Sequence, residues 1–455
     1  MSWRRFLHNP VLWAVVIYAL GVALRLEYTL FISPPDSLIT SDMGLYVDLA
    51  RRIVRGEAPL HPWDVTHPLG YPSLVAFLLK DGGSLARVVH FQLVVSCLVP
   101  LSLGLLGLYA FGRRTALAAL AFASLYFPFI EFGALFLSEI HFIFTLSLAF
   151  ACFLAARTVR RRGVSLLIAA IGGVALSAAA ALKSVALPAA AVFFAAEGLA
   201  DLLKGPLDVA SVRARLVPWV ARCALVVVAA APLLGVLARS CTRANRGNFC
   251  VTGNKVGSDF LLGHYGRIAD IHWGEDEGHG FGFGSPGSYL RHYEQHPSVP
   301  FPMTDNKANA DEAWRWIFAH PFEAGVLSLD HLYDTFLGVA MWPTYGTVGW
   351  TLAHLSQLAF VVLLFVPVLF ALARVAKRGW RAFVTSRTFL VLTPVAALAF
   401  TVVVATGEVR YRVPFDSFFI VVVCALATGE LESPDGVPLP RAAEPPPARA
   451  DLIMT

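Results

Sequence analysis

The chain has 455 residues, of which 57% are hydrophobic and only 15% are charged. So much apolar surface excludes an ordinary water-soluble globular protein. The net charge of +5 is modest, and no basic stripe interleaved with aromatic residues is present, which argues against a nucleic-acid partner.

Apolar runs of about 18–25 residues, each long enough to cross a bilayer, recur along the chain. The first, 11–26, lacks a small-residue cleavage site, so we expect a retained anchor, with a cleaved signal peptide as the alternative. Nine further spans are predicted at 87–111, 115–130, 134–156, 164–181, 185–203, 216–237, 350–373, 389–406 and 414–427. The predicted fold class is therefore an all-α polytopic membrane protein of about ten transmembrane helices.

Basic residues gather on alternate connections between these spans. The clusters are Arg4/Arg5, Arg113/Arg114, Arg157 with Arg160 to Arg162, Lys204 with Arg213/Arg215, and Lys377/Arg378/Arg381. The positive-inside rule makes these connections and both termini cytoplasmic. We therefore expect a multi-pass protein of the cytoplasmic membrane whose polar site lies on the extracytoplasmic face.

The first outer loop, 27–87, contains an amphipathic pattern from Asp42 to Arg55, which predicts a helix along the membrane interface. Asp42 follows Ser41 at the start of this helix, so it either caps the helix or presents a carboxylate to a cavity. Tyr46, one helical turn further on, favours the second interpretation.

A turn rich in proline and glycine follows in the same loop. Pro68 and Pro72 fix this turn, which carries His67 and Tyr71 and leads into a short helix predicted over 73–79.

Two ionisable residues interrupt the later spans at their outer ends. Glu139 heads the fourth span, where a carboxylate is costly unless it is paired or hydrated, although the helix dipole alone would also favour it. His141 is expected to be a packed interfacial histidine. Lys183 interrupts about forty apolar residues and either snorkels to lipid headgroups or holds a phosphate, two readings that stay open.

The segment Glu408 to Pro414 carries Arg410, Tyr411 and Arg412 on the outer side, against the charge trend of the other loops. A lipid phosphate or pyrophosphate would explain these arginines, because guanidinium gives planar, two-pronged recognition. An ion pair between Arg410 and Glu408 is the alternative.

The segment 238–345 is the one sizeable region that is not apolar, and we expect it to form a lid with helices over 305–318 and 323–336. Cys241 and Cys250 lie in it, and we expect them to form a disulfide outside the membrane. Carboxylates and imidazoles that could hold a divalent cation cluster at His272, Glu275, Asp276, Glu277 and His279, although a solvated acidic loop is commoner.

The predicted organisation has four parts. They are a membrane module over 1–237, the lid over 238–345, further membrane helices over 346–430 and a cytoplasmic tail over 431–455. The chain lacks a P-loop, a dinucleotide fingerprint, a His-Glu-x-x-His motif and a nucleophile elbow. ATP-driven pumps, dinucleotide enzymes, zincins and serine hydrolases are therefore not considered further.

Taken in order, four motifs resemble those of GT-C-type integral membrane glycosyltransferases, the group of the dolichyl-phosphate-mannose protein mannosyltransferases and the bacterial aminoarabinose transferases. They are Ser41-Asp42-x-x-x-Tyr46, His67-Pro68-Leu69-Gly70-Tyr71-Pro72, Ser138-Glu139, and Arg410-Tyr411-Arg412-x-Pro414, with a weaker fifth match over 251–263. Many members carry two adjacent acids in the first loop, whereas here Ser41 and Met43 flank Asp42. Asp36 and Asp48 are therefore alternatives to it.

The resemblance implies a GT-C-like bundle and transfer of a sugar from a polyprenyl-phosphate donor to a protein, lipid or glycan acceptor. It implies that Asp42 acts as the base, that Glu139 orients the reactants and that Arg410, Arg412 and Lys183 stabilise the departing phosphate. It further implies that Tyr46, Tyr71, His67 and Tyr411 line the pocket. The alternatives are a transporter or flippase of a lipid-linked glycan, and an O-antigen ligase or polymerase, which would use His264, Arg267 and His292.

Overall fold

The computed structural model describes residues 9–35, 39, 41–276, 279–283, 293–338 and 350–431, without the side chains of 275, 276 and 279–283. Nine helices within these residues are long and apolar enough to cross a membrane, or ten if one bent pair counts as a span. This confirms the predicted polytopic helical fold. The spans are α2 (Pro10–Glu27, extended by a π-helical turn to Ile32), α5 (Leu85–Ala110), α8 (Glu139–Thr158), α9 (Arg162–Leu182), α10 (Ala186–Leu203), α11 (Val209–Ala244), α16 and α17 (Trp350–Phe360 and Val366–Ala376, joined by a π-helical turn), α19 (Arg387–Val404), and α20 with α21 (Val409–Arg412 and Asp416–Thr428).

The bent pair lies where the sequence predicted one straight span over 115–130. Helix α6 (Arg113–Leu125) ends with Tyr126 as its cap. The next segment, formed by α7 (Phe127–Glu131) and a 3-10 turn to Ala134, is bent from α6 by 60°. Pro128 explains the break, because its ring cannot follow the helix and would clash with the carbonyl four residues earlier. The buried Arg25 of α2 donates to the freed carbonyls of Ser124 and Ala123, at 2.6 and 3.1 Å.

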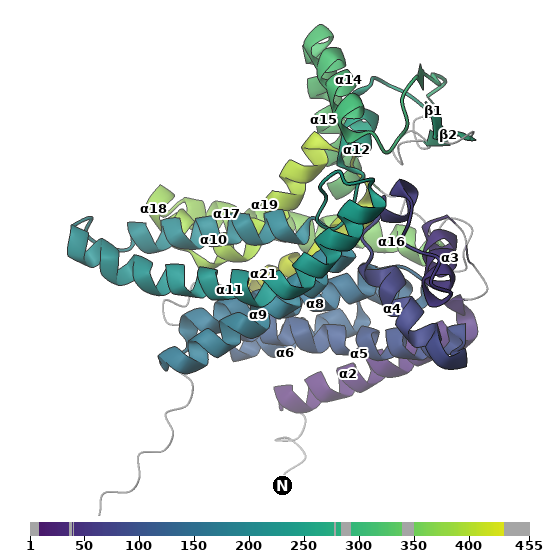
Figure 1. Cartoon of the computed structure of the whole chain (residues 1–455). Helices are drawn as coiled ribbons and strands as arrows, with labels where there is room; N and C mark the ends of the chain where they lie inside the picture. Colours follow the sequence, from purple (N-terminus) through teal and green to yellow (C-terminus); the bar gives the residue numbers. More distant parts are fainter. Residues whose placement is uncertain are drawn as a thin grey trace, which may run out of the picture.

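The bundle helices lie side by side, and the two helices of the first outer loop lie at one end of the bundle (Figure 1). Helices α3 (Asp42–Val54) and α4 (Gly70–Leu79) lie at this end, whereas α18 (Trp380–Thr385) and the α10–α11 connection lie at the other. Helix α4 begins three residues before the predicted 73–79 helix. The arrangement brings the first outer loop beside the N-terminus of α8.

A small arm projects from the bundle near α3. It consists of α12 (Val256–His264), α14 (Asn306–Ala319), α15 (Pro321–Phe336) and a three-stranded sheet in the order β2–β1–β3 (Figure 1). Strand β1 (Ile271–Asp276) pairs antiparallel with β2 (His279–Phe283) and parallel with β3 (Ser298–Val299). The two helices agree closely with the prediction, but the sheet was not predicted, because its strands are short and rich in glycine.

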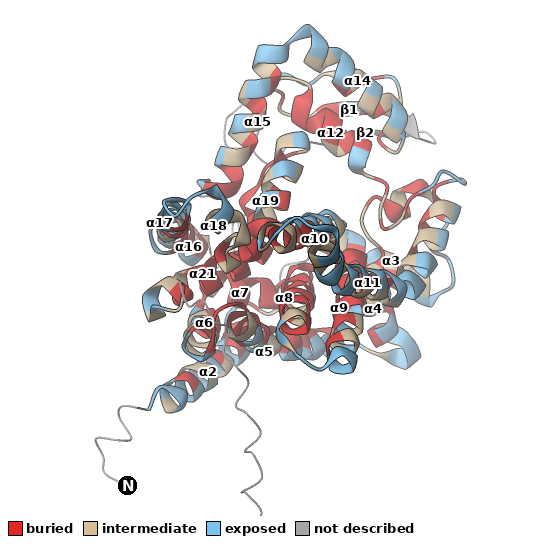
Figure 2. Ribbon diagram, turned by 90° about the vertical axis from the view of Figure 1, so that its left-hand side faces the viewer, coloured by how far each residue is buried: buried red, intermediate tan, exposed pale blue. Residues whose placement is uncertain are grey.

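Buried residues concentrate on the central helices of the bundle, whereas the outer faces of α2 and α11 are exposed (Figure 2). These exposed faces are apolar, for example Val15, Val16, Val227 and Val228. Apolar surface of this kind suits contact with lipid chains, as expected of a membrane bundle.

Candidate active site

Asp42 is the first residue of α3, yet it does not cap that helix. Ser41 occupies the N-cap position, and no side-chain hydrogen bond caps the helix there. The Asp42 carboxylate instead accepts a hydrogen bond from Arg410 Nη1 at 3.0 Å, and its other oxygen lies 3.7 Å from His67 Nε2. Of the two interpretations left open by the sequence, the geometry therefore agrees with a carboxylate turned toward other functional groups.

Arg410 is the centre of a cluster of charged side chains from distant parts of the chain. Its Nε lies 3.6 Å from Glu139 Oε1 and 3.7 Å from Glu408 Oε2. Lys183 Nζ donates to the same Glu139 oxygen at 3.0 Å. Four of the residues selected from the sequence, Asp42, Glu139, Lys183 and Arg410, thus lie together. We call these four with Glu408 the charged cluster.

Two glycines allow the backbones that carry the cluster to approach one another closely. A Cβ on Gly70 would lie 2.3 Å from the carbonyl oxygen of Ala181, so the start of α4 packs directly on the end of α9, just before Lys183. A Cβ on Gly407 would lie 2.1 Å from the carbonyl oxygen of His331, which fixes the segment before Arg410 against α15. Only glycine permits contacts this short.

Within the first outer loop, an ion pair with two hydrogen bonds holds the segment before His67 to α3. Arg52 donates to both carboxylate oxygens of Asp64, at 2.7 and 3.2 Å, and Asp64 also accepts the backbone amides of Leu60 and His61. This fixes the residues that lead into the turn bearing His67.

Aromatic side chains line one side of the charged cluster. The Tyr46 ring lies edge-on to His67 and Tyr71, with centroids 5.7 and 5.3 Å away. The Tyr71 hydroxyl donates to Gln92 at 3.0 Å. His141 stacks on Phe91 at 5.9 Å, which is the packed role that the sequence indicated.

The neighbouring charges shift the proton affinities of this site. Burial would raise the pKa of Asp42, but Arg410, His67 and Lys255 outweigh it and hold that pKa below its usual range. Burial raises the pKa of Glu408 to about 7, an effect that Arg410 partly offsets. Burial lowers the pKa of His67 to about 4, so its imidazole is neutral near pH 7.

Sequence reasoning missed two residues beside this cluster. Lys255 and Asp259, one turn apart at the start of α12, form an ion pair at 3.2 Å, and the field of Lys255 reaches Asp42 and Tyr411. The amide of Asn254 donates to the carbonyl of Val65 at 2.7 Å, which attaches this segment to the first loop. The weak fifth motif over 251–263 was the available signal. Tyr411 also lies here, with its ring 5.7 Å from the Arg410 guanidinium.

Arg412 is not brought to the charged cluster. Its guanidinium is fully buried in the bundle, where it donates to Asp416 at 2.9 Å and Gln357 at 2.5 Å and lies 3.4 Å from the centre of the Phe360 ring. The predicted phosphate contact of Arg412 does not fit this position, because its donors already have partners. We therefore leave Arg412 out of the site proposed below.

The other candidates differ in position. Asp48 is exposed on α3, whereas Asp36 and His292 lie outside the described residues. His264 is buried against Phe260 and His331. Cys241, near the end of α11, is bonded to Cys250, with a Cα–Cα distance of 5.6 Å, and both pack near Val65 and Leu69 of the first loop.

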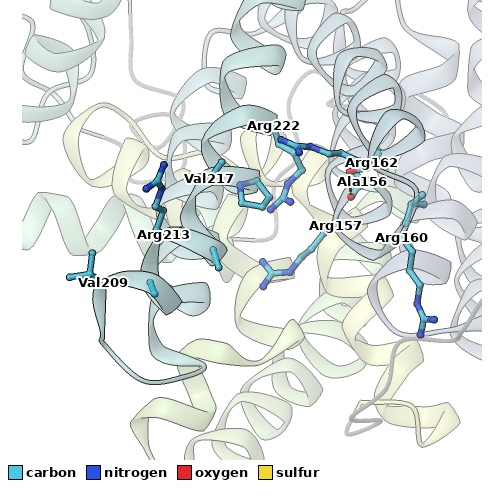
Figure 3. A pocket seen from close by; sticks show the side chains of 13 residues that line it. Ala156, Arg157, Arg160, Arg162, Val209, Arg213, Val217 and Arg222 are labelled. Atoms are coloured by element: carbon cyan, nitrogen blue, oxygen red, sulfur yellow. Dashed lines mark hydrogen bonds between the residues drawn. The ribbon is translucent and has the colours of Figure 1, made fainter.

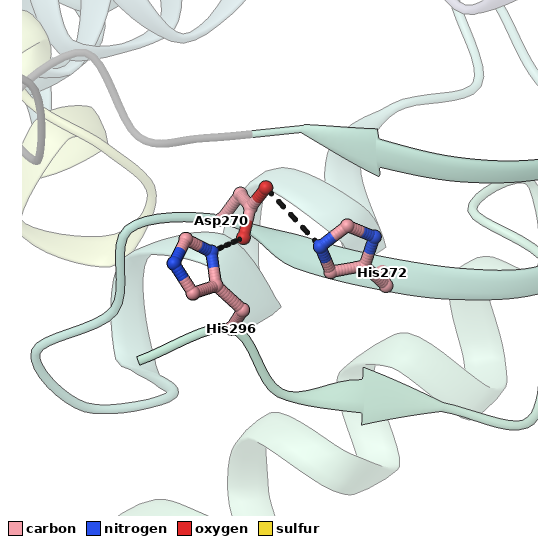
Figure 4. Close-up of side chains that lie close together, drawn as sticks. All are labelled: Asp270, His272 and His296. Carbon is pink, nitrogen blue, oxygen red and sulfur yellow. Dashed lines mark hydrogen bonds and ion pairs between the residues drawn. The ribbon is translucent and has the colours of Figure 1, made fainter. Parts of the chain in front are cut away.

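A group that could hold a divalent cation lies on the projecting arm (Figure 4). The Asp270 carboxylate bonds His296 Nδ1 and lies 3.3 Å from His272 Nε2, and the three ligand atoms are within 4.8 Å of one another. Of the predicted acidic and imidazole cluster, His272 belongs to this group. The side chains of Glu275, Asp276, Glu277 and His279 lie outside the described residues.

Fold and site together define a polytopic helical membrane protein with a charged site at one end of its bundle. The chain resembles the oligosaccharyltransferase of the archaeon Archaeoglobus fulgidus. The crystal structure of that protein tethered to an acceptor peptide with an NVT sequon is 14% identical, matches 91% of this chain and 49% of its own, and gives a TM-score of 0.50. Its complex with an inhibitory peptide and a dolichol-phosphate, there named AglB, is also 14% identical, matches 94% and 51% of the two chains, and gives 0.48.

No protein-family model and no curated protein matches the sequence. At this level of identity the structural likeness concerns the fold alone, which is that of a polytopic helical membrane protein, as predicted. The chain spans about half the length of the solved structures that it matches.

Proposed function

We propose that this protein is a membrane glycosyltransferase that moves a sugar from a polyprenyl-phosphate carrier to an acceptor outside the cytoplasm. The observation that carries the proposal is the hydrogen bond between Asp42 and Arg410. It joins a carboxylate and a guanidinium from opposite ends of the chain at one end of the bundle. The GT-C-like fold is compatible with this activity. The positive-inside distribution supports an extracytoplasmic site in the cytoplasmic membrane.

The reaction needs a base and a cationic site for the leaving group. The acceptor hydroxyl attacks the anomeric carbon and gives its proton to Asp42, while the bond from that carbon to the phosphate oxygen breaks and the phosphate leaves with the electron pair. Attack opposite the leaving group inverts the configuration at the anomeric carbon. Arg410 and Lys183 are suited to stabilise the charge on the departing phosphate.

Donor binding would also activate the base. With Arg410 bonded to it, Asp42 has a low pKa and is a weak proton acceptor. A donor phosphate competes for the same guanidinium, and loss of that contact raises the proton affinity of Asp42. The base would therefore become effective mainly when the donor is in place.

The remaining residues of the site receive supporting roles in this proposal. Glu139, held by Lys183, orients the sugar or the acceptor. Tyr46, His67, Tyr71 and Tyr411 line the pocket. The group of Asp270, His272 and His296 is a candidate site for a divalent cation on the arm.

The test is sugar transfer from polyprenyl-phosphate donors by purified protein, compared between wild type and Asp42→Asn. We expect the variant to lose at least about 100-fold in turnover, as is usual when a positioned base is removed. Asp48→Asn, on the exposed side of the same helix, is the matched control and should retain full activity. Full activity of Asp42→Asn would refute its role as the base.

A second readout separates transfer from transport. Mass spectrometry of envelope glycans, with and without the protein, identifies a glycosylated product and its acceptor. Movement of a lipid-linked glycan across vesicles without any new glycosidic bond would instead identify a flippase.

A further inference from the structure

A cationic pocket lies at the end of the bundle opposite the charged cluster. Glu139 begins α8 and Arg157 is close to its other end, about 27 Å away at 1.5 Å per residue. The pocket has a volume of about 820 Å³ and opens between the α8–α9 connection and α11 (Figure 3). It is lined by five arginines, namely Arg157, Arg160, Arg162, Arg213 and Arg222.

Two of these arginines are already neutralised and form the inner wall. Arg222 donates to Glu197 at 2.8 Å, and Arg157 lies 3.3 Å from Glu197 and bonds Asp201. This partly buried network ties α8, α10 and α11 together. It gives the pocket a fixed shape.

The other three arginines give the pocket its excess charge. Arg160, Arg162 and Arg213 are exposed, and no carboxylate pairs with them among the described residues. Arg162 also begins α9, where the helix dipole adds a partial positive charge. The pocket thus presents three unneutralised guanidinium groups to one small volume.

Apart from Ser165, the rest of the lining is apolar and continuous with the exposed apolar face of α11. Ala156, Val209, Ala214, Val217 and Pro218 complete the wall, and Val209 is 85% exposed. Apolar side chains give a small hydrated anion no favourable contact. A phospholipid, in contrast, carries a phosphate for the arginines and acyl chains for the apolar wall. Basic pockets between membrane helices bind anionic headgroups for this reason.

We propose that this pocket binds the phosphate of an anionic phospholipid, with Arg160, Arg162 and Arg213 on the headgroup and the apolar wall along its chains. Guanidinium groups suit phosphate because they donate paired hydrogen bonds in one plane. The site is independent of the transfer reaction proposed above, since it uses none of the residues of the charged cluster.

The experiment is native mass spectrometry of the purified protein in detergent, titrated with phosphatidylglycerol, cardiolipin or phosphatidylcholine. Wild type should retain the anionic lipids in preference to phosphatidylcholine. The triple variant Arg160→Gln/Arg162→Gln/Arg213→Gln should bind them about 100-fold more weakly.

A control triple, Arg113→Gln/Arg114→Gln/Arg161→Gln, removes equal charge from exposed arginines that do not line the pocket. It should bind lipid like wild type, and a loss equal to that of the pocket variant would overturn the proposal in favour of diffuse attraction. Ala214→Phe fills the hollow without changing its charge and should also weaken binding. Unchanged binding in the pocket triple, or displacement of the lipid by inorganic phosphate at equal concentration, would overturn the lipid site.

Discussion

Arg410 donates a hydrogen bond to Asp42 across 368 residues of sequence, and this contact closes the site between the first outer loop and the last span. Glu139 and Lys183 join it from other segments, and Glu408 lies two residues before Arg410. The members of the charged cluster therefore hold one another in position.

Replacing Arg410 by lysine should separate charge from geometry. Lysine keeps the positive charge but lacks the planar fork that can hold a carboxylate or a phosphate with two bonds. We expect the KM for the donor to rise at least about 10-fold, measured by steady-state transfer kinetics. An unchanged donor KM would contradict the phosphate role of Arg410.

Glu408→Gln should alter the pH dependence of stability. The pKa of Glu408 is raised from 4.5 to about 7 by burial, so the stabilisation from its bound proton is complete below pH 4.5 and is lost as the pH rises through 7. Glutamine cannot ionise, so the variant lacks this loss of stability, which amounts to at most about 3 kcal/mol in wild type. The stability of the variant relative to wild type should therefore increase from pH 5 to pH 8, as measured by thermal unfolding.

The His67 imidazole acts in the opposite direction, because a depressed histidine pKa gives stability that is lost as the pH falls from 6.5 through about 4. Both proteins carry His67, so the difference between them isolates Glu408. A constant difference across this range would contradict the raised pKa of Glu408.

The Lys183 and Glu139 pair offers a double-mutant cycle. Lys183→Met removes the closest partner of a buried carboxylate and should lower stability by about 2 kcal/mol, below the value for fully buried pairs because the lysine is 19% exposed. Adding Glu139→Gln removes the carboxylate, which in the Lys183→Met variant keeps only Arg410 as a neighbouring cation among the described residues, at 3.6 Å, and should restore part of that stability without restoring transfer. Additive effects of the two changes on the melting temperature would show that the pair is not coupled.

Gly70→Ala tests the close approach of α4 to α9. The new Cβ would meet a backbone carbonyl at 2.3 Å, which cannot move cheaply, so we expect a loss of about 1–3 kcal/mol in stability and lower transfer activity. Gly44→Ala is the matched control, because nothing lies within 4 Å of its Cβ and alanine favours the helix. Equal melting temperatures for the two variants would refute the contact.

The sequence predicted the part of this architecture that depends on hydropathy and charge. Local patterns predict the membrane spans and the two arm helices. They also predict that four polar residues lie at the same end of the bundle, namely Asp42, Glu139, Lys183 and Arg410. The inward direction of Arg412 does not follow from its place in a basic motif. Residues two positions apart in a helix point to different sides, and Arg410 and Arg412 therefore face different surroundings.

Other features depend on contacts that no local pattern contains. The ion pair of Lys255 with Asp259 becomes relevant only because Asn254 bonds the first loop. The raised pKa of Glu408 comes from burial by elements far away in sequence. Asp270 and His296 come together through strand pairing, although they lie 26 positions apart in the sequence.

The buried Arg25 has a consequence for how the chain is made. One of its partners, the carbonyl of Gly21, lies in its own helix, but Ser96 of α5 and the carbonyls of Ala123 and Ser124 are synthesised 71, 98 and 99 residues later. Because a guanidinium inside a membrane is costly until it is paired, we expect the first span to reach its final packing only after α5 and α6 have been made. The order of insertion is then part of the information in this sequence.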